Sequence, residues 1–121
     1  MSVCTEVVSK LNKECVQVCL QLITNGKIYT KGKPNGSFHP IRFFLTRDCK
    51  TLYWMSAPLI GFSTQKQISL KEITKMEYES VNGIFTIQTS SSPLKLCIPS
   101  EIDMAQLYQV LLVCKAHSLI N

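Results

Sequence analysis

The period of the hydrophobic pattern changes near residue 26, from the spacing of a helix to that of strands. Before this point, apolar or cysteine side chains recur mostly every three or four positions, which places them on one face of a helix. They are Cys4, Val7, Val8, Leu11, Cys15, Val18, Cys19 and Leu22. Asn25 and Gly26 tolerate the left-handed conformation that often follows a helix. The pattern therefore predicts one amphipathic helix over residues 3–23, packed on its own domain.

After residue 26 the apolar side chains alternate with polar ones, as in half-buried strands. Seven strands are predicted, over residues 28–30, 38–46, 51–55, 67–70, 73–79, 84–89 and 94–99. Residues 47–50 are typical of a tight turn, and Asn82-Gly83 between two alternating runs is a strong hairpin signal. Because no helices alternate with these strands, we expect antiparallel pairing.

The end of the chain again has a helical pattern. Ser100 is a suitable N-cap, and Glu101 and Asp103 in the first turn favour the helix dipole. The expected apolar face consists of Met104, Leu107, Tyr108, Leu111, Leu112, Cys114 and Leu119. The predicted fold is mainly β with helices: a seven-stranded antiparallel barrel or sandwich over residues 26–119, capped by this helix, with an extra N-terminal helix in residues 1–25.

Positive charge is concentrated in the first predicted hairpin. The chain has 13 Lys and Arg residues against 8 Asp and Glu residues, a formal net charge of +5. Residues 27–50 hold six of the bases and only one of the acids. A concentrated basic patch favours an anionic partner, although a solvated, solubilising hairpin has the same composition.

Several classes of protein are disfavoured by what the sequence lacks. No apolar run reaches the roughly 18 to 20 residues of a membrane-spanning helix, and the N-terminal residues have neither the apolar core nor the charge of a secretory signal. We therefore expect a cytoplasmic setting. The six cysteines include no Cys-x-x-Cys pair, so we interpret them as reduced thiols and expect no metal site.

Catalysis and nucleic-acid binding also have little support. No nucleophile or carboxylate is placed by a motif beside His39 or His117, and no phosphate-binding glycine motif is present. We expect neither an enzyme nor a bound cofactor. Basic and aromatic residues interleave over residues 27–54, but the aromatics mostly alternate onto the predicted core face, so we expect no nucleic-acid partner.

Three segments in the same order carry a resemblance to a known family. They are IRFFLTRDCKTLYWMS, SLKEI and FTIQTSSSPLKLCIPSEIDMAQLY. Together with the predicted fold they resemble pleckstrin homology (PH) domains, the closest being those of phospholipase C delta type, over residues 20 to 118. A leading helix before a lone PH domain also resembles the small acylated PH-domain proteins that sense phosphatidic acid. Those proteins carry an N-terminal Gly-Cys acylation signal, whereas this chain has Ser2.

The resemblance implies a site for phospholipid headgroups. Such PH domains carry a basic residue late in the first strand and a Lys/Arg-x-Arg pattern in the second, which suggests Lys31, Lys33 and Arg42 here. Pro40 stands where the pattern has its first base, which argues against a stereospecific bisphosphate site. Tyr108 replaces the characteristic Trp of the last helix.

Further residues complete the expected site. Other headgroup candidates are Lys27, His39, Arg47, Lys50, Tyr53 and Lys66, and candidates for membrane insertion are Phe38, Leu59, Ile60 and Phe62. The apolar candidates have an alternative interpretation as ordinary packing under a long loop. The predicted function is membrane recruitment in signalling: a peripheral protein on the cytosolic face that binds phosphatidic acid or a phosphoinositide. The alternative is a protein–protein interaction adaptor without specific lipid binding.

Overall fold

The computed structural model describes residues 4–32, 36–56, 65–91 and 93–120. Its elements are α1 (Thr5–Val8), α2 (Lys13–Thr24), β1 (Lys27–Gly32), β2 (Phe38–Leu45), β3 (Thr51–Ser56), β4 (Lys66–Ser69), the 3₁₀ turn η1 (Leu70–Glu72), β5 (Lys75–Glu79), β6 (Ile84–Gln88), β7 (Leu94–Cys97) and α3 (Glu101–Ile120). The seven strands form one antiparallel sheet in the order β4-β3-β2-β1-β7-β6-β5. The predicted fold class is confirmed.

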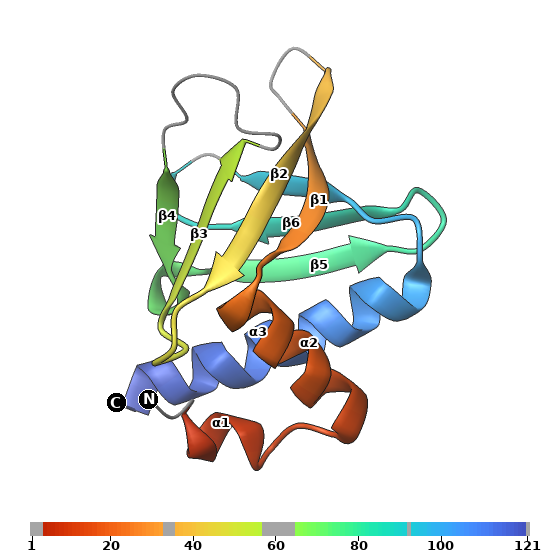
Figure 1. Ribbon diagram of the computed structural model, residues 1–121. Helices are drawn as coiled ribbons and strands as arrows, with labels where there is room; N and C mark the ends of the chain where they lie inside the picture. Colours follow the sequence, from red (N-terminus) through yellow and green to blue (C-terminus); the bar gives the residue numbers. More distant parts are fainter. Residues whose placement is uncertain (1–3, 33–35, 57–64, 92, 121) are drawn as a thin grey trace.

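Strand β1 joins the two halves of this sheet. It pairs with β2 along its whole length, and Thr30 and Lys31 also pair with β7. The β1–β4 half therefore folds over the β5–β7 half, and the strands of the two halves cross (Figure 1). Helix α3 covers one end of this barrel, which we call the closed end. The end at which β1 finishes with Gly32 and β2 begins with Phe38 is the open end (Figure 1).

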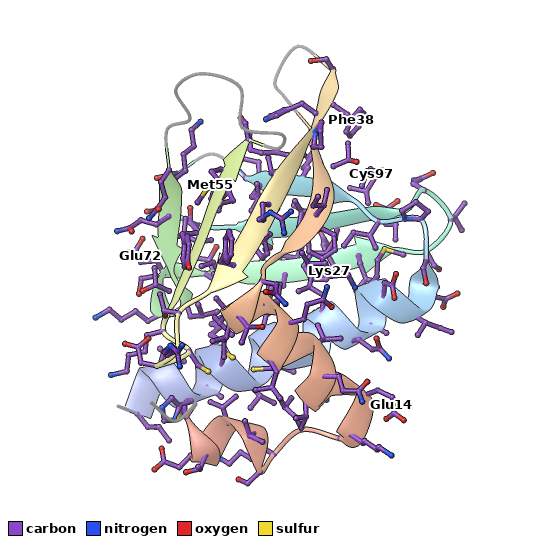
Figure 2. The ribbon with its side chains drawn as sticks, in the orientation of Figure 1. Glu14, Lys27, Phe38, Met55, Glu72 and Cys97 are labelled. Carbon is purple, nitrogen blue, oxygen red and sulfur yellow. The ribbon has the colours of Figure 1, made fainter. Side chains whose placement is uncertain are left out.

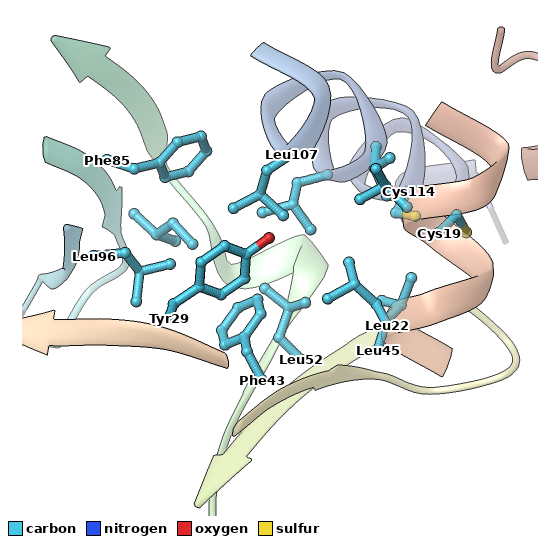
Figure 3. Packing of buried hydrophobic residues seen from close by; sticks show 14 of the residues in the cluster. Cys19, Leu22, Tyr29, Phe43, Leu45, Leu52, Phe85, Leu96, Leu107 and Cys114 are labelled. Atoms are coloured by element: carbon cyan, nitrogen blue, oxygen red, sulfur yellow. The ribbon is translucent and has the colours of Figure 1, made fainter. Parts of the chain in front are cut away.

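The core lies between the two halves of the sheet and α3. Phe43 and Phe85 are fully buried from opposite halves, and Tyr29 packs edge-on against Phe43 (Figure 3). Burying an aromatic or aliphatic side chain of this size stabilises the fold by roughly 1.5 to 3 kcal/mol. The tight turn and the Asn82-Gly83 hairpin form as predicted, the latter with Gly83 at a φ of +66°.

The predicted N-terminal helix is two helices, because the chain breaks at residues 9–12. The Asn12 side chain accepts a hydrogen bond from the Cys15 backbone N–H at 2.8 Å and so starts α2 as its N-cap. Helix α2 ends at Asn25 as expected. Gly26 has a φ of +70°, and a Cβ added there would lie 2.7 Å from the Phe44 ring, so a glycine is needed at this position.

Helix α3 begins as predicted, but its buried face coincides only in part with the predicted one. Ser100 Oγ accepts a hydrogen bond from the Asp103 backbone N–H at 3.2 Å. Leu112 and Leu119, expected in the core, are exposed. The buried residues are Met104, Leu107, Val110, Leu111, Cys114, His117 and Ser118. The buried face is broader and rotated because α3 packs against α1 and α2 as well as against the barrel.

Candidate functional site

A cavity of about 470 Å³ opens at the open end of the barrel. Both halves of the sheet contribute to it, since its walls come from β1, β3 and β4 on one side and from β6, β7 and the segment between them on the other. The lining residues are Lys31, Trp54, Lys66, Gln67, Ile68, Ile87, Thr89, Ser91, Pro93 and Leu94. The cavity is therefore lined by apolar side chains, two lysines and several neutral polar groups.

The two lysines come from strands that are not neighbours. Lys31 lies in β1, opposite His39 of β2, and both side chains belong to the inner face of the sheet. Lys66 lies in β4, opposite the buried Trp54 of β3. A lysine ammonium is a mobile point charge that makes charge-assisted hydrogen bonds to phosphate oxygens, and a Thr or Ser hydroxyl can donate another. The cavity is therefore suited to a small anion.

Arg42 does not join this cavity. Its partners across the sheet are Ile28 and Met55, so its side chain belongs to the outer face, whereas Lys31 belongs to the inner face. The guanidinium Nη1 donates a hydrogen bond to the Asn25 carbonyl oxygen at 2.9 Å. Arg42 thus ties β2 to the end of α2, and its position is that of a structural contact.

Lys27 and Tyr53 also lie apart from the cavity. Lys27 is at the start of β1, next to α2 and far from the hairpin tip (Figure 2). Its Nζ lies 5.7 Å from the centre of the Tyr29 ring, within the range of a cation–π interaction. Tyr53 is on the outer face, where it stacks on Phe44 with ring centres 4.8 Å apart.

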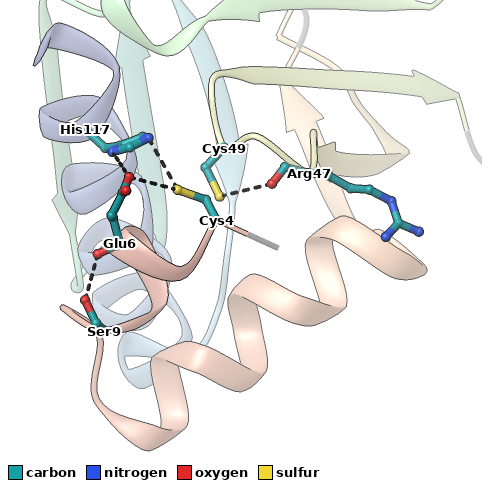
Figure 4. Close-up of polar contacts among 6 residues, drawn as sticks. All are labelled: Cys4, Glu6, Ser9, Arg47, Cys49 and His117. Atoms are coloured by element: carbon teal, nitrogen blue, oxygen red, sulfur yellow. Dashed lines mark hydrogen bonds and ion pairs between the residues drawn. The ribbon is translucent and has the colours of Figure 1, made fainter. Parts of the chain in front are cut away.

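Arg47 and Lys50 lie in the β2–β3 turn at the closed end, beside α2 and α3 (Figure 4). The turn is closed by Asp48, whose Oδ1 accepts hydrogen bonds from Thr46 Oγ1 at 2.6 Å and from the Lys50 backbone N–H at 3.1 Å. The pKa of Asp48 is lowered mainly by the hydrogen bond from Thr46 and to a smaller extent by Lys50. These two predicted cations are thus at the opposite end from Lys31 and Lys66.

Phe38 is at the base of the hairpin tip, near the open end (Figure 2). Half of its surface is exposed. Its ring lies over Gly32, where an added Cβ would meet the ring at 3.2 Å. Lys33, Leu59, Ile60 and Phe62, also predicted for this site, lie outside the described residues.

Lys66 of β4 was among the predicted residues, but the sequence pattern identified neither Gln67 of β4 nor the segment between β6 and β7. Gln67, Thr89 and Ser91 line the cavity, and none of them was a candidate for the site. Thr89 and Ser91 reach the site because β7, which follows them, pairs with β1, a contact between positions far apart in the sequence. Local patterns carry no signal for such a contact.

Solved structures with the same architecture include inner membrane complex sub-compartment protein 3 (ISP3) from Toxoplasma gondii, at 12% identity and a TM-score of 0.69 over 98% of both chains. The PH domain from PfAPH matches at 17% identity and a TM-score of 0.65, over 92% of this chain and 98% of that one. The N-terminal PH domain of human ARAP2 matches at 16% identity and a TM-score of 0.62, over 80% and 84%. The chain has the PH fold.

Neither a protein-family model nor a curated protein sequence matches the chain. The likeness to PH domains is therefore one of structure at low sequence identity. In the described part of the chain, no helix has the length and apolar character needed to cross a bilayer.

Proposed function

We propose that this PH-fold domain recruits its protein to membranes by binding an anionic phospholipid headgroup, from phosphatidic acid or a phosphoinositide, in the cavity at the open end. The observation that carries the proposal is that Lys31 and Lys66, from separate strands, both line this cavity beside Thr89 and Ser91. Ammonium groups and hydroxyls are the kinds of donor that make hydrogen bonds to phosphate oxygens.

The composition of the cavity favours a singly phosphorylated headgroup. Arginine's planar fork suits bidentate recognition of phosphates, but the cavity contains no arginine among the described residues, and Arg42 is on the outer face. Pro40, which replaces a base of the family pattern, is consistent with this. Phosphatidic acid is thus preferred over a lipid with two phosphates on its inositol ring.

The position of the site suits a membrane surface. Phe38 is exposed beside the open end, so its ring can enter the headgroup region while the lysines bind phosphate. Each basic residue near an anionic leaflet contributes about 1 kcal/mol to membrane binding. The protein would act as a peripheral, non-catalytic module on the cytosolic face.

The direct test is co-sedimentation with vesicles that contain phosphatidic acid, phosphatidylserine or single phosphoinositides at equal total charge, at low and raised salt. We expect the strongest binding to phosphatidic acid, with part of it retained at raised salt. Binding that follows total charge alone would contradict a headgroup pocket. No binding to any vesicle would refute the lipid function and favour the protein-interaction alternative.

Two double variants that remove the same charge locate the site. Lys31→Ala with Lys66→Ala should weaken binding about 30-fold, because two lysine contacts of about 1 kcal/mol each are lost. Arg47→Ala with Lys50→Ala, at the closed end, should change binding less than threefold. Arg42→Ala is expected to behave like this control. Equal losses in the two double variants would show that net charge, and not the cavity, determines binding.

A further inference from the structure

Three potential metal ligands converge where α1 meets the end of α3, away from the lipid site (Figure 4). Cys4 precedes α1, Glu6 is in its first turn, and His117 is in the last turn of α3. Cys4 Sγ lies 3.3 Å from His117 Nε2 and 3.8 Å from Glu6 Oε2, and His117 Nδ1 lies 3.6 Å from the same Glu6 oxygen. One ligand atom from each residue lies within 4.8 Å of the other two.

The arrangement differs from that of a catalytic relay. In a relay, the imidazole separates the thiol from the carboxylate, because each is bound to a different ring nitrogen on opposite sides of the ring. Here too the two groups contact different ring nitrogens, but Cys4 Sγ and Glu6 Oε2 are only 3.8 Å apart and are not separated by the imidazole. The three groups are therefore close enough together to share one ion.

The spacing of the three groups is near that around a small cation. Zinc binds a thiolate at about 2.3 Å, an imidazole nitrogen at about 2.0 to 2.1 Å and a carboxylate oxygen at similar length, so tetrahedral ligands are roughly 3.3 to 3.6 Å apart. Only one nitrogen of His117 can bind the ion, and one ligand atom from each of the three residues lies within 4.8 Å of the other two. Binding therefore requires these atoms to move closer together by at most about 1.5 Å, which rotation of the exposed Glu6 side chain allows. Thiolate, imidazole and carboxylate are also the ligand types that zinc prefers.

The surroundings favour a defined site. His117 is only 8% exposed, whereas Glu6 is exposed and Cys4 is half-buried, so one ligand is fixed by packing and the site remains open to solvent. Ser9 Oγ donates to the Glu6 carbonyl oxygen at 3.0 Å and stabilises the short helix that carries Glu6. Cys4 and His117 are 113 residues apart, which is why no sequence spacing predicted a metal site.

We propose that Cys4, Glu6 and His117 form a binding site for Zn²⁺, with a water molecule as the fourth ligand. The thiol of Cys4 gives its proton to the solvent on binding, since the thiolate is the ligand. The bound ion would link α1 to the end of α3 and hold the N-terminal helices on the closed end of the domain.

A second group of thiols lies nearby and must be distinguished from this site. Cys19 of α2, Cys49 of the β2–β3 turn and Cys114 of α3 are buried and interact with one another through their sulfur atoms. Zinc bound there would have three sulfur ligands, whereas the proposed site has one. The number of sulfur ligands therefore separates the two possibilities.

The test is a titration of the metal-free full chain with Co²⁺, which replaces Zn²⁺ and gives visible bands when tetrahedral, followed by competition with Zn²⁺. We expect one equivalent to bind, with a thiolate charge-transfer band in the near ultraviolet. X-ray absorption at the zinc edge should show one sulfur neighbour and otherwise nitrogen or oxygen. No bound equivalent, or three sulfur neighbours, would overturn the proposal.

Matched variants assign the ligands. Cys4→Ser should remove the charge-transfer band and weaken Co²⁺ binding at least tenfold, and His117→Gln should weaken binding to a similar extent. Cys97→Ser, a half-buried thiol on β7, and Glu14→Gln, an exposed carboxylate at the start of α2, should bind as the unaltered chain does. Full binding by Cys4→Ser, or equal loss in Cys97→Ser, would contradict the assignment. The edge spectrum of the unaltered chain decides the question even if a variant fails to fold.

Discussion

The two ends of the barrel differ in how completely their side chains are packed. At the closed end, α3 and the N-terminal helices cover the sheet, and Leu22, Leu45 and Leu111 are fully buried. At the open end, Lys31 is half-buried and Lys66 is exposed around a cavity of about 470 Å³. The comparison indicates that stability resides mainly at the covered end, which leaves the other end available for a ligand.

The basic residues of the first hairpin are divided between these two ends of the barrel. Strands β1 and β2 run from one end of the barrel to the other (Figure 1). Basic residues that are close in sequence are therefore placed at opposite ends, as with Lys31 at the open end and Arg47 in the turn of the closed end. A basic segment in a sequence is thus not necessarily one basic site on the surface.

The largest effect is expected from two adjacent leucines of α3. Leu111→Ala should lower the free energy of unfolding by about 3 kcal/mol, because a fully buried leucine leaves a cavity in the closed end. Leu112→Ala should cost less than about 1 kcal/mol, since Leu112 is 41% exposed. Urea denaturation measures both. Similar losses for the two variants would contradict the buried face described for α3.

Removing the Tyr29 hydroxyl should have a smaller effect, of opposite sign. This hydroxyl is buried in the core and has no hydrogen-bond partner among the described residues (Figure 3). Burial is also the main cause that raises the pKa of Tyr29. Tyr29→Phe should raise the free energy of unfolding by about 1 kcal/mol, because an unsatisfied buried polar group destabilises the fold. Tyr53→Phe, which removes the hydroxyl of an outer-face tyrosine, is the control. A lower free energy of unfolding for Tyr29→Phe would show that the Tyr29 hydroxyl has a hydrogen-bond partner.

The smallest effect concerns the turn of the closed end. In the folded state the pKa of Asp48 is lowered, chiefly by the hydrogen bond from Thr46. The Asp48 charge therefore stabilises the fold at pH values above the unfolded pKa of about 3.8. This stabilisation is lost as the pH falls through the pKa of the folded state. Asp48→Asn should cost a few tenths of a kcal/mol at neutral pH, because solvent screens an exposed group. The difference in melting temperature from the unaltered chain should vanish in acid.

Much of the fold could be predicted because its signals are local. Alternation located all seven strands, Ser100 located the start of α3, and Asn25-Gly26 located the end of α2. The break before α2 was missed although Asn12 is a favourable N-cap, because the helical spacing of apolar residues continues across it. The buried face of α3 was partly wrong, since it depends on which elements pack around it.

The candidate site was less predictable. The sequence pointed to Lys31 and Lys66, which line the cavity, but grouped them with Arg42, which lies on the other face of the sheet. The face of a strand residue depends on the register with its neighbours, and a shift of one residue reverses it. The cavity also needs the β1–β7 pairing, which no local pattern predicts.

The central claim is that a phosphate headgroup binds at the open end and not along the whole basic hairpin. The most direct measurement is an NMR titration of the ¹⁵N-labelled domain with a short-chain phosphatidic acid below its micelle concentration. We predict saturable shifts of the amide signals of Lys31, Lys66 and Thr89, with those of Arg47 and Lys50 unchanged. Shifts of equal size at both ends, or shifts confined to the β2–β3 turn, would contradict the account.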